Sequence, residues 1–506
     1  MAASTVHELI ELQAATRPQA VYALSTEGGR KSIGFGELAR GCRTVAAVLH
    51  AHGARPGDTV SVVMPNGLQT LRLLLGAMHG GLCVNPVNLL SQPEQMRYVL
   101  AHSDCRVVCV APEWEARVRA MLDGIGRPVE VLVAGPDADA LPGEAQATPV
   151  HEVAPPTAGD VALLMYTSGT TGMPKGVMLT QGNLAANAHA ISAEHALQPA
   201  DRVLAVLPLY HINAFAVTML APLAHGGSLA MPPKFSAGRF WEQASGTRCS
   251  WINVVPTMIS YLLEGDEPPP AQTAAIRFCR SASAALPPEH HRAFEQKFGI
   301  GIVETMGLTE TAAPSFSNPL DPALRKLGSV GRASGCEARV IDAALAEVPD
   351  GSTGELAIRG PNVMRGYYKN EEATRASFTP DGWLRTGDLG HRDADGFFFV
   401  TGRIKELIIK GGENIAPREI DEALLRHPAV LEAAAVGVPD RHYGQEIGVC
   451  IVLRDGCACT EEELRAFSTE ALGRYKAPGH YRFVTDLPRG PSGKVQRLKL
   501  LPLFER

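Results

Sequence analysis

The segment 166–176, Tyr-Thr-Ser-Gly-Thr-Thr-Gly-Met-Pro-Lys-Gly, combines residue types that bind phosphate groups. Glycine permits backbone conformations that turn several N–H groups toward one anion. The four Ser and Thr hydroxyls supply further donors, and Lys175 supplies a positive charge. Apolar runs at 161–165 and 177–179 flank the segment, and the first of them is strand-like. We therefore predict a loop that holds a polyphosphate.

The two best-known nucleotide-binding loops do not occur in this chain. A Walker A loop needs Gly, four residues and then Gly-Lys-Ser/Thr, and no window of the sequence supplies it. No Gly-x-Gly-x-x-Gly follows a strand-like run either, so the dinucleotide-binding fingerprint is missing. The phosphate loop must belong to a different family.

Composition and charge exclude several classes of protein. A length of 506 residues suggests about three domains at roughly 150 residues each. The net charge of -6 gives no reason to expect nucleic acid or an anionic membrane as a partner. Glu8 and Glu11 do not suit a secretory signal, and no apolar run approaches the roughly 20 residues of a membrane span. For these reasons we expect a cytoplasmic protein. The ten cysteines lack zinc-site spacing, so we expect buried free thiols.

The chemistry-bearing residues need a scaffold, and most of the chain predicts an α/β fold. Short apolar strands, as at 59–63, 203–207, 251–255 and 276–279, are separated by helical segments. Strands spaced in this way pair in parallel through crossover helices. After Gly328 the pattern changes to strand-turn-strand. We predict a large N-terminal domain of doubly wound, mostly parallel sheets over residues 1–404, with a β-rich subdomain at about 328–404.

The last hundred residues predict a separate, small α+β domain over residues 405–506. Pro417 suits the first position of a helix that runs to about residue 426. The segment 460–463, Thr-Glu-Glu-Glu, is a capping box that opens another helix. Strands are expected at 432–438 and 447–453.

Several motifs in a fixed order resemble the adenylate-forming superfamily, which contains acyl-CoA synthetases, peptide-synthetase adenylation domains and luciferases. The resemblance covers nearly the whole chain. It rests on the phosphate loop and on motifs at 281–286, 304–310, 386–388, 402–406 and 491–494. Family members activate a carboxylate with ATP and pass the acyl group to a thiol. The resemblance therefore implies an AMP-forming acid–CoA ligase that uses ATP, Mg²⁺ and coenzyme A.

The resemblance assigns nucleotide-binding roles along the chain. The residues expected to contact ATP or CoA are Thr167, Ser168, Gly169, Thr170, Thr171, Gly172, Lys175, Ser283, Ala284, Ala285, Glu304, Thr305, Met306, Gly307, Thr309, Asp388, Arg403, Lys410, Gly411, Gly412 and Lys494. Asp388 would accept both ribose hydroxyls. Met306 departs from the family pattern, because a tyrosine usually stacks on the adenine there.

The catalytic residues implied by the resemblance are Lys494, Arg403, Thr309, Glu310 and His211. Glu310, together with Thr167, would bind Mg²⁺, because a hard cation prefers oxygen ligands. Arg403 and Lys494 would stabilise the negative charge that grows on the α-phosphate oxygens during attack by the carboxylate. Lys405 would be the hinge at which the small domain turns between the two half-reactions.

The acyl pocket is expected around His211, Asn213, Phe215, Ser281, Ser283 and Leu308. The block at 279–286 resembles the oxalate-activating branch, which carries a second histidine where this chain has Asn213. An uncharged hydrogen-bonding residue there favours a small or polar acid over a long fatty chain. A substrate with a second carboxylate would need an arginine beside Met306, and Thr305 is not one.

Other functions stay open at this point. An amino-acid or aryl adenylation enzyme that serves a carrier protein would share the ATP motifs, and so would a long-chain fatty acyl-CoA synthetase or a luciferase-type oxygenase. A non-catalytic nucleotide-binding scaffold would be expected to have lost Glu310 or Lys494, and both are present. The expected partners are a small-molecule acid, ATP and CoA, and the protein is expected to be a monomer or a homodimer.

Overall fold

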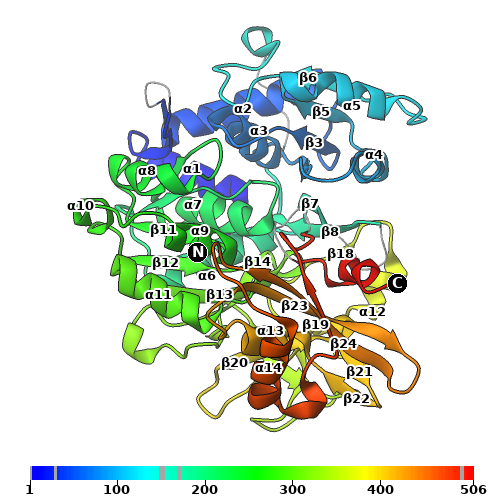
Figure 1. Ribbon diagram of the computed structural model, residues 1–506. Helices are drawn as coiled ribbons and strands as arrows, with labels where there is room; N and C mark the ends of the chain where they lie inside the picture. The colour runs from blue at the N-terminus through cyan, green and yellow to red at the C-terminus, as the bar shows by residue number, and fades with distance from the viewer. Residues whose placement is uncertain (1–2, 28–30, 148–153, 168–172, 490–494, 506) are drawn as a thin grey trace.

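A computed structural model describes residues 3–27, 31–147, 154–167, 173–489 and 495–505. Within them the strands form sheets of nine, seven, four and five strands. Figure 1 shows helices packed between and around the two larger sheets, with the C-terminal unit in orange and red beside the strands that precede it. The predicted α/β class, with a large N-terminal domain and a smaller C-terminal domain, is confirmed.

The seven-stranded sheet carries the phosphate-loop segment. Its order is β18 (Gly366–Tyr367), β8 (Lys175–Thr180), β7 (Val161–Thr167), β4 (Cys83–Pro86), β3 (Thr59–Val63), β5 (Val107–Val110) and β6 (Glu130–Val133). The five strands from β7 to β6 run parallel, and β8 and β18 are antiparallel additions. The helices of this region are α2 (Phe35–Ala51), α3 (Leu68–His79), α4 (Pro93–His102) and α5 (Glu115–Leu122).

The nine-stranded sheet carries the predicted acyl and adenine segments. Its order is β15 (Arg332–Ala333), β14 (Ala313–Ser317), β13 (Ile302–Leu308), β12 (Phe278–Ser281), β11 (Trp251–Val254), β9 (Arg202–Leu204), β10 (Ser228–Met231), β1 (Val21–Ser25) and β2 (Ser32–Gly34). The strands from β13 to β1 run parallel. Associated helices are α1 (Val6–Thr16), α6 (Gln181–Glu194), the π-helical η3 (Asn213–Leu220), α7 (Ala221–His225), α8 (Phe240–Gly246), α9 (Pro256–Glu264), α10 (Pro270–Thr273) and α11 (Pro288–Phe298).

Two strand predictions were misplaced at their ends. The strand expected at 203–207 is β9, which ends at Leu204, and the strand expected at 276–279 is β12, which runs on to Ser281. The apolar pattern breaks at Arg280, so the sequence pattern ended the strand one residue before it. In the structure, pairing with β11 and β13 on both sides continues through Arg280.

The remaining sheets follow in chain order. The antiparallel four-stranded sheet consists of β16 (Glu337–Ile341), β17 (Gly354–Arg359), β19 (Leu384–Arg392) and β20 (Phe398–Arg403), with α12 (Glu371–Ala376) between β18 and β19 in the chain. The five-stranded sheet consists of β22 (Glu413–Ile415), β21 (Ile408–Lys410), β24 (Gly444–Leu453), β23 (Val430–Asp440) and β25 (His480–Phe483), with α13 (Pro417–Leu424) and α14 (Glu461–Lys476).

Packing separates the small unit from the rest. One continuous hydrophobic core joins both large sheets through α1, α2, α3 and α6, with Leu9, Leu74 and Leu184 fully buried. The five-stranded sheet has its own core around Ile420 and Leu464. Each fully buried Leu or Ile contributes about 1.5–3 kcal/mol of hydrophobic stabilisation, so the small unit is stabilised largely by its own residues.

Local signals for the small unit are confirmed. The Thr460 hydroxyl accepts from the Glu463 N–H at 3.2 Å, and the Glu463 carboxylate accepts from the Thr460 N–H at 2.8 Å. Pro417 is the first residue of α13.

The ten cysteines are free and seven of them are buried, as expected. Among the described residues, no helix combines the length and apolar character that a membrane crossing requires.

Candidate active site

The phosphate-loop segment joins the antiparallel strands β7 and β8, which pair Thr167 with Lys175. Residues 168–172, with the predicted phosphate contacts Ser168, Gly169, Thr170, Thr171 and Gly172, lie outside the described residues. The Lys175 ammonium lies 4.8 Å from the centre of the Tyr367 ring. An aromatic face attracts a cation at this distance, so Tyr367 positions the lysine at the base of the loop.

Glu310, the predicted magnesium ligand, contacts the same tyrosine. The Tyr367 hydroxyl donates to Glu310 Oε1 at 2.8 Å, while the Met364 N–H donates to the Glu310 carbonyl. Burial and the nearby Glu310 raise the pKa of Tyr367, so its hydroxyl remains a donor. Two predicted site residues, Lys175 and Glu310, therefore contact the same tyrosine. Sequence analysis missed Tyr367, because only the pairing of β18 with β8 places it there.

Asp388 and Arg403 face each other across β19 and β20. Arg403 donates from Nε to Asp388 Oδ1 at 2.6 Å and from Nη2 to Oδ2 at 3.4 Å. The carboxylate charge raises the pKa of Arg403. Gly387, at φ +73°, turns the chain through the left-handed region before Asp388. The two residues predicted to hold the ribose and the α-phosphate are thus a preformed, oriented pair.

The predicted adenine-side residues follow β12 and form part of β13. Ser283 is half-buried at φ +75°, a strained conformation for a residue with a side chain, and Ala284 and Ala285 are exposed. Met306 is half-buried against the hydrophobic cluster of the four-stranded sheet. At Gly307 a Cβ would lie 2.0 Å from the Ala313 carbonyl oxygen, so only glycine fits.

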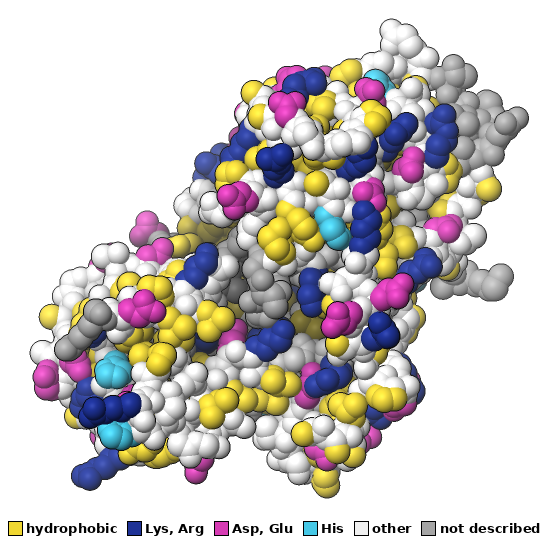
Figure 2. Space-filling model, turned by 90° about the vertical axis from the view of Figure 1, so that its right-hand side faces the viewer, with side chains coloured by type: hydrophobic (Ala, Val, Ile, Leu, Met, Phe, Trp, Pro, Cys, Tyr) yellow, Lys and Arg dark blue, Asp and Glu magenta, His cyan; other side chains and the backbone are white. Residues whose placement is uncertain are grey.

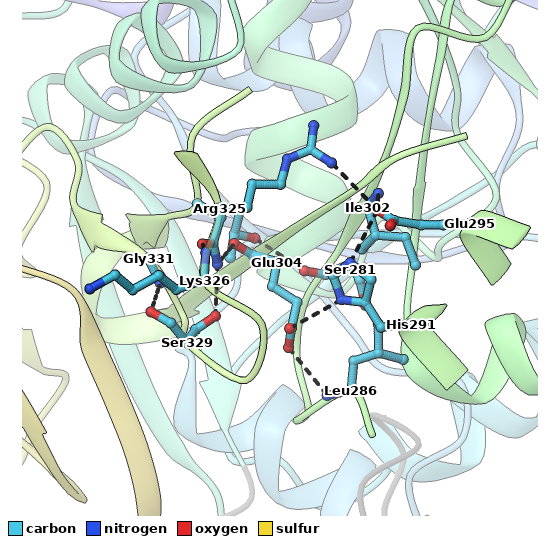
Figure 3. Close-up of polar contacts among 12 residues, drawn as sticks. Ser281, Leu286, His291, Glu295, Ile302, Glu304, Arg325, Lys326, Ser329 and Gly331 are labelled. Carbon is cyan, nitrogen blue, oxygen red and sulfur yellow. Dashed lines mark hydrogen bonds and ion pairs between the residues drawn. The ribbon is translucent and has the colours of Figure 1, made fainter. Parts of the chain in front are cut away.

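The Glu304 carboxylate contacts the end of this loop at Leu286 (Figure 3). Its buried carboxylate lies 3.4 Å from the Leu286 N–H and 3.6 Å from His291 Nδ1. The Thr305 hydroxyl donates to the Ser281 carbonyl at 3.4 Å. The side chain of Glu304 therefore holds the end of the loop in place, and its predicted contact with adenine stays a prediction.

Three of the predicted acyl residues, His211, Asn213 and Phe215, lie at or just before the start of η3. His211 lies edge-on to Tyr210, with ring centres 4.8 Å apart. Asn213 is buried as the first residue of η3, and Phe215 is completely buried in the large core. Leu308 is half-buried at the end of β13. π-Helical turns are frequent at functional sites, which agrees with the role predicted for this segment.

A polar chain that sequence analysis did not predict runs beneath these residues. The Asn213 Nδ2 donates to Ser283 Oγ at 3.2 Å, and its Oδ1 accepts from Arg280 Nη1 at 2.7 Å. Arg280 Nη1 also donates to Asn253 Oδ1 at 2.7 Å. The signal in the sequence was a charged residue inside an otherwise apolar buried strand, at Arg280.

The small unit holds the remaining predicted residues. Lys405 is exposed in a 3₁₀ turn over Ile404–Glu406, directly after β20. Lys410 is buried and donates to Glu446 and to the Tyr475 carbonyl, whereas Gly411 and Gly412 form an exposed turn. Lys494 lies outside the described residues.

The small unit contacts the large one at β20, where helix α13 packs beside the strand. Arg418 Nη1 donates to the Val400 carbonyl of β20 at 2.6 Å. Arg454 lies close enough to His290 of α11 to add to the effect of burial, which lowers the pKa of that histidine. Figure 2 shows a hollow on the face turned toward the viewer, with Lys and Arg side chains around it.

Comparison with known proteins agrees with this arrangement. The AMP-binding enzyme family matches residues 10–368, and the AMP-binding enzyme C-terminal domain matches residues 419–494. A sulfoacetate–CoA ligase of Cupriavidus necator is 59% identical over 98% of this chain and 97% of its own. An oxalate–CoA ligase of Arabidopsis thaliana is 35% identical over 90% of each chain. The crystal structure of ATP-bound MatB from Rhodopseudomonas palustris superposes on this structure with a TM-score of 0.92 at 30% identity, covering 99% of both chains.

The motifs, the two-part fold and these matches extend over the same length of chain. The protein therefore belongs to the AMP-binding enzyme family, the adenylate-forming enzymes, and is an ATP-dependent acid–CoA ligase.

Proposed function

We propose that this ligase activates a small, polar carboxylic acid of the size of sulfoacetate or oxalate. The observation that carries the proposal is the buried polar chain from Ser283 through Asn213 to Arg280, at the position where a pocket for a long acyl chain would be apolar. The similarity to a sulfoacetate–CoA ligase and to an oxalate–CoA ligase supports the same size class.

In the first half-reaction, a carboxylate oxygen of the acid attacks the α-phosphorus of ATP, and the bond to the pyrophosphate oxygen breaks. Lys175 and the 167–172 loop neutralise the β- and γ-phosphates, and Asp388 accepts from the ribose hydroxyls. Arg403 and Lys494 stabilise charge that grows on the α-phosphate. Glu310 and Thr167 offer the hard oxygen ligands that suit Mg²⁺, which supplies positive charge at the phosphate oxygens when bound.

In the second half-reaction, the thiol of CoA attacks the acyl carbon and AMP leaves. We place the hinge at Lys405, between the domains 1–404 and 405–506, because this exposed turn joins β20 to the first strand of the small sheet. A Lys405→Pro variant should release pyrophosphate normally and form little thioester, because proline restricts the backbone that must turn. Equal loss of both half-reactions would remove the hinge assignment.

The test of the substrate class is pyrophosphate release over a panel of acids, with and without CoA. The panel contains oxalate, sulfoacetate, acetate, benzoate, an amino acid and a long fatty acid. The small polar acids should give the highest kcat/KM, with CoA required for thioester and AMP formation. A response to the long fatty acid alone would refute the proposal, and CoA-independent turnover would point to a carrier-protein substrate.

The proposal includes a cytoplasmic enzyme that acts as a monomer or homodimer, without nucleic acid or membrane as a partner. The net charge of -6 supports the last point. Light scattering at several protein concentrations decides between monomer and dimer.

A further inference from the structure

Arg280 is a fully buried arginine in the interior of β12. It pairs in register with Asn253 of β11, so both side chains lie on the same face of the sheet. That face meets the start of η3, because Arg280 contacts Asn213 there. Only 1% of the residue is exposed.

Among the described residues, no acidic side chain pairs with Arg280. Its Nη1 donates to the amide oxygens of Asn213 and Asn253, and its Nε has no hydrogen-bond partner among the described residues. Burial lowers the pKa of Arg280 to about 9, so the side chain remains protonated at neutral pH. A buried charge without a counter-ion costs several kcal/mol, and neutral amide oxygens offset only part of that cost.

Two arginines that are less buried than Arg280 are paired with acidic residues. Arg497 of the small unit donates to Asp421 at 2.5 Å and lies 3.3 Å from Glu406. Arg277, three residues before Arg280, lies 2.6 Å from Asp201. The guanidinium of half-buried Arg202 also donates to neutral groups, the Ser228 hydroxyl and the Thr247 carbonyl, but Arg280 differs from it in being fully buried.

The unbalanced charge is connected by hydrogen bonds to the predicted acyl residues. Asn213 joins Arg280 to Ser283, and the Ser283 hydroxyl is half-buried at the strained turn after β12. One side chain therefore separates the guanidinium from the surface that the acid is predicted to contact. Across so short a distance in a poorly solvated interior, a positive charge attracts an anion far more strongly than it does in water.

We propose that Arg280 is the residue that selects acids with a second anionic group, a sulfonate or a carboxylate, over acids of the same size with one charge. This inference rests on the proposed function. The second anionic group lies at the Asn213 and Ser283 end of the pocket, with Arg280 as its counter-charge. The carboxylate to be activated then points away, toward the α-phosphate. Thr305 stands where a different arginine was expected for such a substrate, and Arg280 provides the charge from the neighbouring strand.

The test compares sulfoacetate with methylsulfonylacetate, which replaces one charged oxygen by a methyl group and keeps the size. The wild-type enzyme should prefer sulfoacetate. Arg280→Met should lower kcat/KM for sulfoacetate by about 100-fold, mainly through KM, the usual scale for removing one partner of a buried charge pair. Activity with methylsulfonylacetate should change little. Arg277→Met, which removes a charge already paired with Asp201, is the matched control and should leave the preference intact.

A second variant covers the case in which Arg280→Met does not fold. Asn213→Asp places a carboxylate beside Arg280 Nη1, which neutralises the arginine without removing it. This variant should also lose the preference for sulfoacetate.

The outcomes separate the two claims. Equal loss with both acids in a folded Arg280→Met enzyme, or retained preference in Asn213→Asp, would overturn the role of Arg280 and leave the proposed substrate size untouched. A wild-type enzyme that uses both acids equally well would overturn the inference alone. A wild-type enzyme that activates neither of these acids nor oxalate would refute the proposed function.

Discussion

Arg403 and Arg280 are proposed to act at the nucleotide end and the acid end of the candidate site, and they differ in what balances their charge. Arg403 is paired with Asp388 across two strands, and this carboxylate raises its pKa. Arg280 contacts two neutral amides, and burial lowers its pKa. A paired arginine is already oriented and can act on the ATP that every acid requires. An arginine without an acidic partner gains a counter-ion only when the substrate carries a second anionic group.

The comparison predicts that removing a cation at the nucleotide end slows acyl-adenylate formation equally for all acids. The largest effect is expected for Lys494. Lys494→Ala should lower the rate of acyl-adenylate formation by roughly 10²–10³-fold, as for one lost transition-state donor. The loss should be the same for sulfoacetate and methylsulfonylacetate, measured as pyrophosphate release. Lys499→Ala, at an exposed lysine of the same terminal segment, serves as the control. Adenylate formation at the parental rate with failure of thioester formation would show that Lys494 was wrongly assigned.

Breaking the Arg403 pair should have the next largest effect. Asp388→Asn keeps the shape of the side chain but removes its charge, so kcat/KM for ATP should fall roughly tenfold to a hundredfold, the worth of one or two charge-assisted hydrogen bonds. Steady-state kinetics at varied ATP would show it with any acid. Asp381→Asn, at an exposed aspartate paired with Arg339, should have no such effect. If kcat/KM for ATP fell only with dianionic acids, the proposed difference between the nucleotide end and the acid end would be wrong.

Tyr367 gives a smaller effect on the nucleotide end. Tyr367→Phe keeps the ring beneath Lys175 and removes the hydroxyl that orients Glu310, so adenylation should slow about tenfold and require more Mg²⁺ for half-maximal rate. A Mg²⁺ titration of pyrophosphate release measures both. The control is Tyr368→Phe, whose hydroxyl instead contacts Asp104. An unchanged Mg²⁺ requirement would separate Tyr367 from the predicted metal site.

The smallest effect concerns a charge cluster with no predicted substrate role. A hydrogen bond from His79 and the charge of Arg43 hold the pKa of Glu11 at about 2, below its ordinary value of 4.5. Because the folded-state pKa is the lower one, the ionised Glu11 stabilises the fold above about pH 4.5, and this contribution disappears as the pH falls toward 2. Glu11→Gln should therefore flatten the acid limb of urea unfolding midpoints and leave acid preference unchanged. A changed preference between sulfoacetate and methylsulfonylacetate would mean that distant charges also affect substrate selection electrostatically.

Much of the site could be read from local sequence. Residue types at 166–176, the acid at Glu310 and the aspartate after Thr386-Gly387 carry their chemistry in side chains and short turns, whose conformations depend mainly on near neighbours. The capping box at Thr460 and the proline that opens α13 were predictable for the same reason. The order of these motifs also implied the fold and the acid–CoA ligase activity.

The amino-acid sequence by itself predicted the reaction class, because its ordered motifs resemble those of the adenylate-forming superfamily and each motif consists of residues close together in the chain. Only the tertiary structure decided which distant side chains meet. It placed Tyr367 between Lys175 and Glu310 through the pairing of β18 with β8. In the sequence, Arg280 is only a charged residue in an apolar strand. The tertiary structure shows that it is buried and donates hydrogen bonds to Asn213 and Asn253. The balance of a buried charge is a property of its whole surroundings, and these come from β11, β12 and η3 together.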